Sequence, residues 1–180
     1  MHSKNFFIII SFIIFLIFVY FSYLVAKETF TQFDFNTTVK FQDHFSRRWD
    51  LPFSILSILG SAEVTGVIWL CLVAFCLIKR YWLSLIALFL FWAGMAFEVF
   101  GKVFVYHPGP PFLFYRGVIK FDFPSSYAHT AYSYPSGHLT RTSFLIAFAL
   151  VFIYLKLPKR FGFLPVLFLL LFLVLMMISR

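Results

Sequence analysis

Residues Tyr134-Pro135-Ser136-Gly137-His138 directly precede a long apolar segment, which makes them a candidate anion site at the start of a helix. A serine suits the N-cap position, a glycine lets an anion approach the backbone, and helix N-termini attract phosphate through free N–H groups. His138 is expected in the first helical turn, within reach of the same anion. An imidazole there can protonate the oxygen that leaves when a phosphate ester is cleaved. The alternative interpretation is an ordinary helix cap with His138 as an interfacial polar residue.

The composition indicates that lipid is the solvent of this protein. Of 180 residues, 62% are hydrophobic and 12% are charged, which leaves a soluble domain no place to bury its apolar surface. The net charge of +8 includes no basic run with interleaved polar residues, so a nucleic-acid partner is not expected. Cys71 and Cys76 point to different faces of one helix without a nearby histidine, which favours small apolar lining residues over a metal or disulfide role.

Apolar periodicity and length predict an all-α integral membrane bundle with five spans. The polar segment 27–50 is predicted to be an extramembrane loop. Residues 1–50 would therefore form a signal-anchor helix and loop, and residues 51–180 a membrane core. The expected spans are residues 6–26, 51–78, 81–97, 139–155 and 161–178.

Basic residues in the short loops predict the orientation in a plasma membrane. The segments at Lys4, Lys79 and Lys156 are short and rich in lysine and arginine, so we expect them in the cytoplasm. If the helices alternate, Lys102, residues 135–138 and the C-terminal Arg180 then all lie on the extracytoplasmic face.

The order of three fragments resembles the type 2 phosphatidic acid phosphatase superfamily, in its membrane branch. The pattern of that superfamily is Lys-x6-Arg-Pro, then Pro-Ser-Gly-His, then Ser-Arg-x5-His-x3-Asp, on six membrane helices. Residues 135–138 match the second element in full, and residues 179–180 match the start of the third. Lys102 and Pro110 match the ends of the first element, but Gly109 stands where an arginine is expected. The resemblance covers residues 63–180.

That resemblance implies an enzyme that hydrolyses a lipid phosphomonoester or diphosphate through a phosphohistidine, without a metal or an organic cofactor. Lys102, Ser136, the Gly137 amide and Arg180 would bind the phosphate, and His138 would protonate the leaving group. A snorkelling interface lysine is the alternative for Lys102. The attacking histidine falls six residues beyond Arg180 and its aspartate ten beyond, so we expect the 180-residue chain to lack its nucleophile and to be inactive.

The expected partners are the bilayer and a lipid phosphate. Phosphatidic acid, phosphatidylglycerophosphate and polyprenyl diphosphate all fit, and nothing in the residues separates them. Two other interpretations stay open. In the first, the chain is a non-catalytic membrane protein that binds phospholipid headgroups. In the second, it is an inactive gene fragment.

Arg141 lies one helical turn after His138, in an apolar segment where an arginine is costly unless it is paired or near water. We hypothesise that Arg141, or Arg116 in the preceding loop, supplies the guanidinium that Gly109 cannot. The alternative for Arg141 is snorkelling at the membrane interface.

Four further polar residues have weaker signals. Glu98 stands four residues before Lys102, so the two side chains are positioned to pair on one helix. Glu63, at the start of an apolar run, is interpreted as a helix-start or interhelical polar contact. His107 and His129 lie in the loop before residue 135 and are interpreted as loop polar residues.

Overall fold

Helices make up most of the computed structural model, which describes residues 2–111, 114–119, 121, 123–127, 130, 132–156 and 159–179. Short 3-10 helices in the connecting segments include η1 (Arg47–Trp49) and η3 (Pro124–Tyr127). The described residues contain no strand, so the expected all-α class is confirmed. The α-helices are α1 (His2–Ala26), α2 (Thr31–His44), α3 (Asp50–Leu59), α4 (Ala62–Ile78), α5 (Trp82–Phe104), α6 (Gly137–Lys156) and α7 (Lys159–Ile178).

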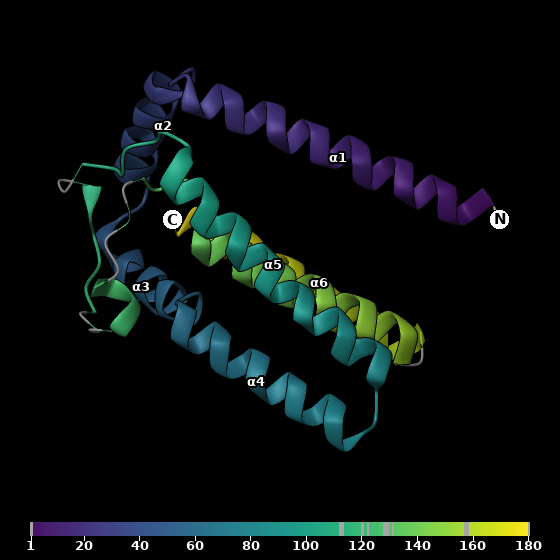
Figure 1. The fold of residues 1–180 in the computed structure, drawn as a ribbon. Coiled ribbons are helices and arrows are strands. Elements are labelled where there is room, and N and C mark those ends of the chain that lie inside the picture. The colour runs from purple at the N-terminus through teal and green to yellow at the C-terminus, as the bar shows by residue number, and fades with distance from the viewer. Residues whose placement is uncertain are drawn as a thin grey trace.

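Helices α4, α5, α6 and α7 form a bundle in which α6 contacts the other three (Figure 1). Its small core includes Trp69, whose indole N–H donates to the Leu88 carbonyl oxygen over 2.9 Å. Cys76 belongs to this core whereas Cys71 is exposed, and both are free thiols. The two cysteines therefore lie on different faces of α4, as expected. Many large apolar side chains on these helices remain exposed, which is typical of a surface solvated by lipid.

The N-terminal helix α1 runs alongside the bundle with little packing against it (Figure 1). Its apolar stretch, Asn5–Ala26, has a mean hydropathy of 2.8, yet only 6% of it is buried. Near its C-terminal end, the Ser22 hydroxyl lies 3.1 Å from the Tyr134 hydroxyl, and the rings of Phe21 and Tyr134 are 6.4 Å apart. Residues just before α6 thus meet α1.

The segment 51–78 is not one straight span, as the sequence suggested, but two helices with a 50° bend between them. Ser61 has an extended backbone and caps α4, because its hydroxyl oxygen accepts a hydrogen bond from Val64 N over 3.3 Å. A Cβ atom at Gly60 would lie 3.0 Å from His138 Cδ2 and 3.1 Å from Met176 Cε, so α6 and α7 press against the break. The apolar pattern of the sequence continues through this break, so the pattern did not predict the break.

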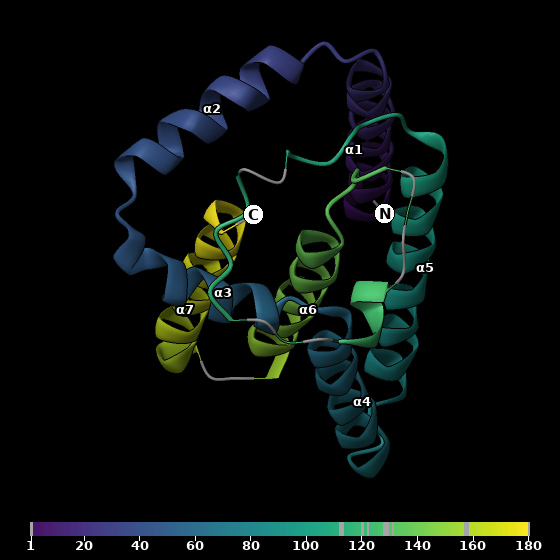
Figure 2. The ribbon, with the colours of Figure 1, turned by 90° about the vertical axis from the view of Figure 1, so that its left-hand side faces the viewer.

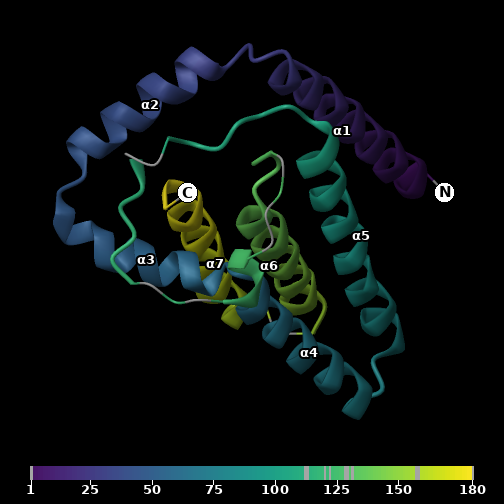
Figure 3. The same cartoon turned by 60° about the vertical axis from the view of Figure 1, so that its left-hand side comes forward.

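The segment 27–50 was expected to be a loop, but it contains α2 and η1. Asp34 in the first turn and His44 in the last turn of α2 complement the helix dipole. Exposed Phe33, Phe35 and Phe41 beside polar side chains are typical of a helix at a membrane surface. Figures 2 and 3 show α2 and α3 forming an arc around the end of the bundle where α7 terminates.

Three helices among the described residues are long and apolar enough to cross a membrane: Asn5–Ala26, Trp82–Phe104 and Gly137–Leu155. The bent pair of α3 and α4 would make a fourth span if it crosses as one unit. The apolar part of α7 that the structure describes, Phe163–Ile178, is shorter than this length requires. The helices are therefore compatible with a membrane protein, whereas the five-span count is not confirmed.

Candidate functional site

The segment that precedes α6 is fastened to the end of α5 by hydrogen bonds. Tyr132 N donates to Lys102 O over 3.1 Å, and Ser133 N donates to His107 O over 2.9 Å. The Ser133 hydroxyl donates to the same His107 oxygen over 3.1 Å. As a result, the C-terminal end of α5 and the N-terminal end of α6 lie at the same end of the bundle (Figure 1).

Two glycines let these helix ends touch. A Cβ atom at Gly101, on α5, would overlap the Pro135 ring. A Cβ atom at Gly137, the first residue of α6, would overlap the Glu98 carboxylate and come 2.8 Å from Arg141 Nη1. Any larger residue at either position would therefore push the start of α6 away from α5.

Glu98 joins two basic side chains at this contact. Its Oε1 lies 2.7 Å from Lys102 Nζ, and its Oε2 lies 2.7 Å from Arg141 Nη1. The Glu98 and Arg141 side chains are each 7% exposed and that of Lys102 is 22% exposed, so water screens these charges weakly. The expected pairing of Glu98 with Lys102 is confirmed. Lys102, Glu98 and Arg141 are called the Glu98 bridge below.

Arg141 is not fully satisfied by this bridge. Its Nε atom is buried and has no hydrogen-bond partner among the described residues. The neighbouring Thr142 Oγ1 is buried without a partner there as well. A buried N–H of a charged group that lacks an acceptor costs free energy, and such groups in native structures call for an explanation. A bound anion would supply the acceptor.

The first turn of α6 adds backbone donors to the same place. Ser136 O accepts hydrogen bonds from Thr140 N and from Thr140 Oγ1, both over 3.0 Å, so the helix begins regularly at Gly137. The first N–H groups of a helix have no intrahelical acceptor and carry partial positive charge. The Glu98 carboxylate lies against Gly137, so an anionic group stands beside the first residue of this helix.

His138 follows Gly137, but its imidazole lies toward another neighbour. Its Cδ2 atom comes close to Gly60 at the α3–α4 break, where Met176 of α7 also packs. Met176 is fully buried and lies one turn before Ser179, whose hydroxyl donates to Met176 O over 2.9 Å. The start of α6 and the end of α7 therefore meet at the α3–α4 break, on the same end of the bundle as the Glu98 bridge.

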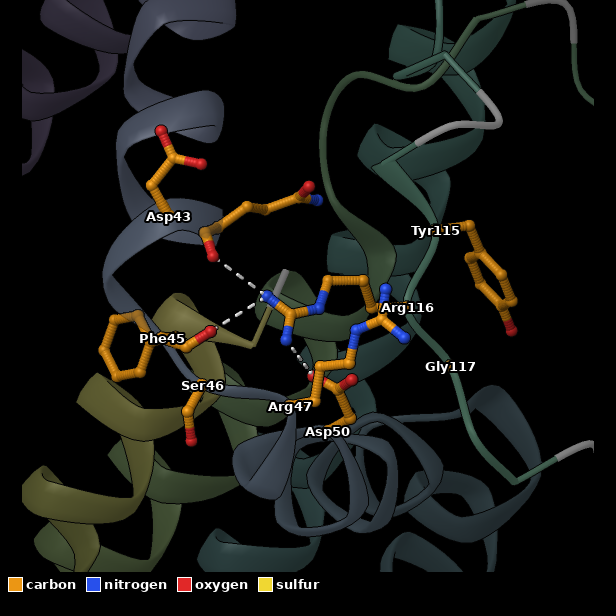
Figure 4. Close-up of a pocket in the computed structure, with 9 residues that line it drawn as sticks. Asp43, Phe45, Ser46, Arg47, Asp50, Tyr115, Arg116 and Gly117 are labelled. Carbon is orange, nitrogen blue, oxygen red and sulfur yellow. Dashed lines mark hydrogen bonds and ion pairs between the residues drawn. The ribbon is translucent and has the colours of Figure 1, made fainter.

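Arg116 has a different environment (Figure 4). Its Nη2 lies 2.8 Å from Asp50 Oδ1, and its Nη1 donates to Gln42 O and Phe45 O over 3.2 and 3.1 Å. These partners join the loop to the α2–α3 connection beside an open cavity of about 590 Å³. Of the two arginines proposed to replace the one missing at Gly109, Arg141 is the one that the structure places beside Lys102.

The other candidate residues that the structure describes, Glu63 and His107, make contacts outside the Glu98 bridge. Glu63, in the first turn of α4, accepts hydrogen bonds from Ser125 N and Ser125 Oγ of η3 over 2.7 and 2.9 Å, which agrees with the expected helix-start or interhelical polar contact. The His107 ring lies 6.3 Å from the Tyr134 ring. Arg180 and His129 lie outside the described residues. In the described part of the chain, no cluster of three or more His, Cys, Asp or Glu side chains could hold a metal ion.

Sequence reasoning did not foresee that Glu98 also pairs with Arg141. The signal was present, because Glu98 is the one acidic residue in the apolar segment Trp82–Phe104. A charge buried at such a position requires partners. The partner on a second helix could not be named, because periodicity says nothing about which helix faces α5.

Comparisons of this chain with protein-family models, with curated proteins and with solved structures found no match.

Proposed function

We propose that the Glu98 bridge and the N-terminus of α6 form a binding site for the phosphate group of a membrane lipid. The carrying observation is that Lys102 and Arg141, from two different helices, meet at one helix N-terminus while Arg141 Nε has no acceptor among the described residues. Two cations and free backbone N–H groups are the donors that phosphate oxygens require. Ser136 and the Gly137 amide stand at the same helix start and serve as further donors in this proposal.

The proposed reaction is hydrolysis of a lipid phosphomonoester or diphosphate at the extracytoplasmic face, as the resemblance to type 2 phosphatidic acid phosphatases implies. In that reaction, the attacking histidine that the resemblance implies forms a P–N bond through its imidazole. The P–O bond to the lipid breaks, and His138 gives its proton to the departing oxygen. Water then releases phosphate from the imidazole. Lys102 and Arg141 would neutralise the charge on the phosphoryl oxygens, so the scheme needs no metal.

A non-catalytic protein that binds lipid headgroups is the second candidate function. The observation in its favour is that, in the described contacts, Lys102 and Arg141 pair with Glu98 and not with an imidazole. Lys102, Arg141 and the N-terminus of α6 would suffice for binding, whereas a phosphohistidine mechanism needs a second histidine directed at phosphorus.

Binding and turnover separate these candidates when the protein is placed in phosphatidylcholine nanodiscs with added phosphatidic acid. We expect binding that Lys102→Gln weakens at least about tenfold, because it removes a poorly screened cation. Lys40→Gln, which removes the same charge from the exposed face of α2, is the matched control. Release of inorganic phosphate supports the enzyme, and binding without release supports the headgroup-binding protein. Equal binding of phosphatidic acid by both variants and the parent contradicts the site.

The proposed orientation is tested by cysteine labelling in intact cells, after Cys71 and Cys76 are replaced by alanine. Helix α2 and the C-terminal end of α4 lie at opposite ends of the bundle (Figure 1). Asp43 belongs to α2 and Lys79 directly follows α4, and both are exposed. A membrane-impermeant maleimide should label Asp43→Cys and spare Lys79→Cys. The reverse pattern would place the Glu98 bridge on the cytoplasmic side.

A further inference from the structure

We propose that Glu98 is a built-in competitor for the phosphate site, and that it makes the site select phosphate monoesters over phosphodiesters. This inference rests on the proposed phosphate-binding function and assigns Glu98 a role in specificity. The chemistry recognised is a phosphate group with two negative charges, whether it is carried by a lipid or is free inorganic phosphate.

The geometry supports this role because Glu98 occupies the place where the phosphate would bind. Both carboxylate oxygens are committed, one to Lys102 and the other to Arg141, each at 2.7 Å. The same carboxylate lies against the Cα atom of Gly137, at the N-terminus of α6. A phosphate that takes over the contacts with Lys102 Nζ and Arg141 Nη1 at this helix end must therefore displace the carboxylate.

The charges decide which ligands can displace it. Lys102 and Arg141 carry two positive charges and Glu98 one negative charge, and Glu63 adds a weaker attraction to Arg141 from α4. A phosphodiester carries one negative charge, so it would only exchange one monoanion for another. It would also compete with a carboxylate that α5 holds in place, at high effective concentration.

A phosphate monoester has two advantages over Glu98. It carries a charge of about −1.5 to −2 at pH 7, which matches both cations. It also has three terminal oxygens in place of the two of a carboxylate, and the third can accept from Arg141 Nε, which lacks an acceptor in the bridge. In a membrane where phosphodiester lipids are abundant, this competition would keep the site available for the monoester.

The direct test compares Glu98→Gln with the parent protein in phosphatidylcholine nanodiscs that contain either phosphatidic acid or phosphatidylglycerol. Phosphatidic acid is the monoester probe and phosphatidylglycerol the diester probe. We expect Glu98→Gln to bind the diester at least about tenfold more tightly, since close charge pairs couple strongly when buried, and to lose selectivity for the monoester. Glu28→Gln, which removes the same charge at an exposed turn, should leave both affinities unchanged.

Competition by inorganic phosphate shows whether the site recognises the phosphate group alone or needs the rest of the lipid. If it competes with phosphatidic acid in the parent and more strongly in Glu98→Gln, the phosphate group alone is recognised. If inorganic phosphate does not compete with phosphatidic acid in either the parent or Glu98→Gln, then Glu98 does not compete for the phosphate group, and the inference is wrong.

A second variant guards against loss of folding, because Glu98→Gln leaves Arg141 without its charged partner. Glu98→Asp retains the charge but is one methylene shorter, so it should reach only one cation and give an intermediate loss of selectivity. Added phosphate should also restore the thermal stability of Glu98→Gln, since it takes the place of the carboxylate. If Glu98→Gln keeps the parent's selectivity, or if phosphate fails to stabilise it, the inference is wrong. The proposed function still stands in that case, provided that the parent binds the monoester. Absence of monoester binding by the parent overturns both.

Discussion

Arg116 and Arg141 each pair with one carboxylate, yet the two guanidinium groups are satisfied to different degrees. Arg116 bonds Asp50 and two carbonyl oxygens (Figure 4). Its side chain remains 26% exposed to solvent. Arg141 bonds Glu98, is 7% exposed, and has a buried Nε atom without a partner in the described structure. The first environment fastens a loop to two helices, whereas the second retains capacity for another acceptor. Pairing alone therefore does not distinguish the two arginines, but the buried donor without a described partner does.

The largest effect on phosphate affinity is expected at Arg141, the less satisfied of the two arginines. Arg141→Gln should weaken binding of phosphatidic acid by about a hundredfold or more, because it removes a buried charge-assisted donor. Arg116→Gln should change that affinity by less than about twofold, since its partners lie on the α2–α3 connection. Titration of both variants in nanodiscs measures the difference. Equal losses of affinity would mean that the two arginines do not have separate roles.

Gly137 offers a second way to perturb the Arg141 environment without changing a charge. Gly137→Ala places a methyl group against the Glu98 carboxylate and Arg141 Nη1, and we expect about tenfold weaker phosphate binding as α6 shifts. Gly109→Ala is the matched control, because a Cβ atom there meets nothing within 4 Å. Unchanged affinity in Gly137→Ala would show that the contact between Gly137 and the bridge is not needed for binding.

Arg116 should matter for stability more than for binding. Arg116→Gln removes an ion pair and weakens two hydrogen bonds, which we expect to lower the free energy of unfolding by about 1–2 kcal/mol after allowance for solvent screening. The increase in melting temperature that phosphate produces should be the same as in the parent. Thermal unfolding in detergent, with and without phosphate, checks both points. A lost phosphate response would assign Arg116 to the binding site.

A small effect on affinity is also expected at Glu63, which attracts Arg141 without contacting it. Glu63→Gln retains an acceptor for Ser125 and should alter phosphate affinity by less than about threefold. Affinity measured beside that of Glu98→Gln separates a distant carboxylate from a contacting one. A change as large as that of Glu98→Gln would show that overall negative charge, and not occupation of the site, controls binding.

Local pattern was sufficient for several features of this protein. Hydrophobic runs predicted an all-helical, lipid-compatible chain and the helices α1 and α6 close to their observed bounds. The spacing of four residues predicted the contact of Glu98 with Lys102, because residues on successive helical turns share one face. These features depend on neighbours in sequence, so the sequence alone determined them.

Other features depend on contacts that no local pattern encodes. The bend at Gly60 arises where His138 and Met176 press against the α3–α4 connection, although the apolar run continues through it. The polar segment 27–50 forms α2, which extends around the end of the bundle. A polar composition was compatible with either a loop or a surface helix, so it did not decide between them.

The sequence by itself contained the residues that we propose recognise phosphate: a lysine, an arginine within an apolar helix, and a Pro-Ser-Gly-His segment at a helix start. Only the tertiary structure decided that Arg141, and not Arg116, stands beside Lys102, and that Glu98 lies between the two cations. The reason is physical. A charge buried in a poorly screened interior must find a partner, but the partner's identity depends on which helices pack together and how closely their backbones approach. Here that approach is set by Gly101 and Gly137, whose missing side chains let α5 and α6 meet.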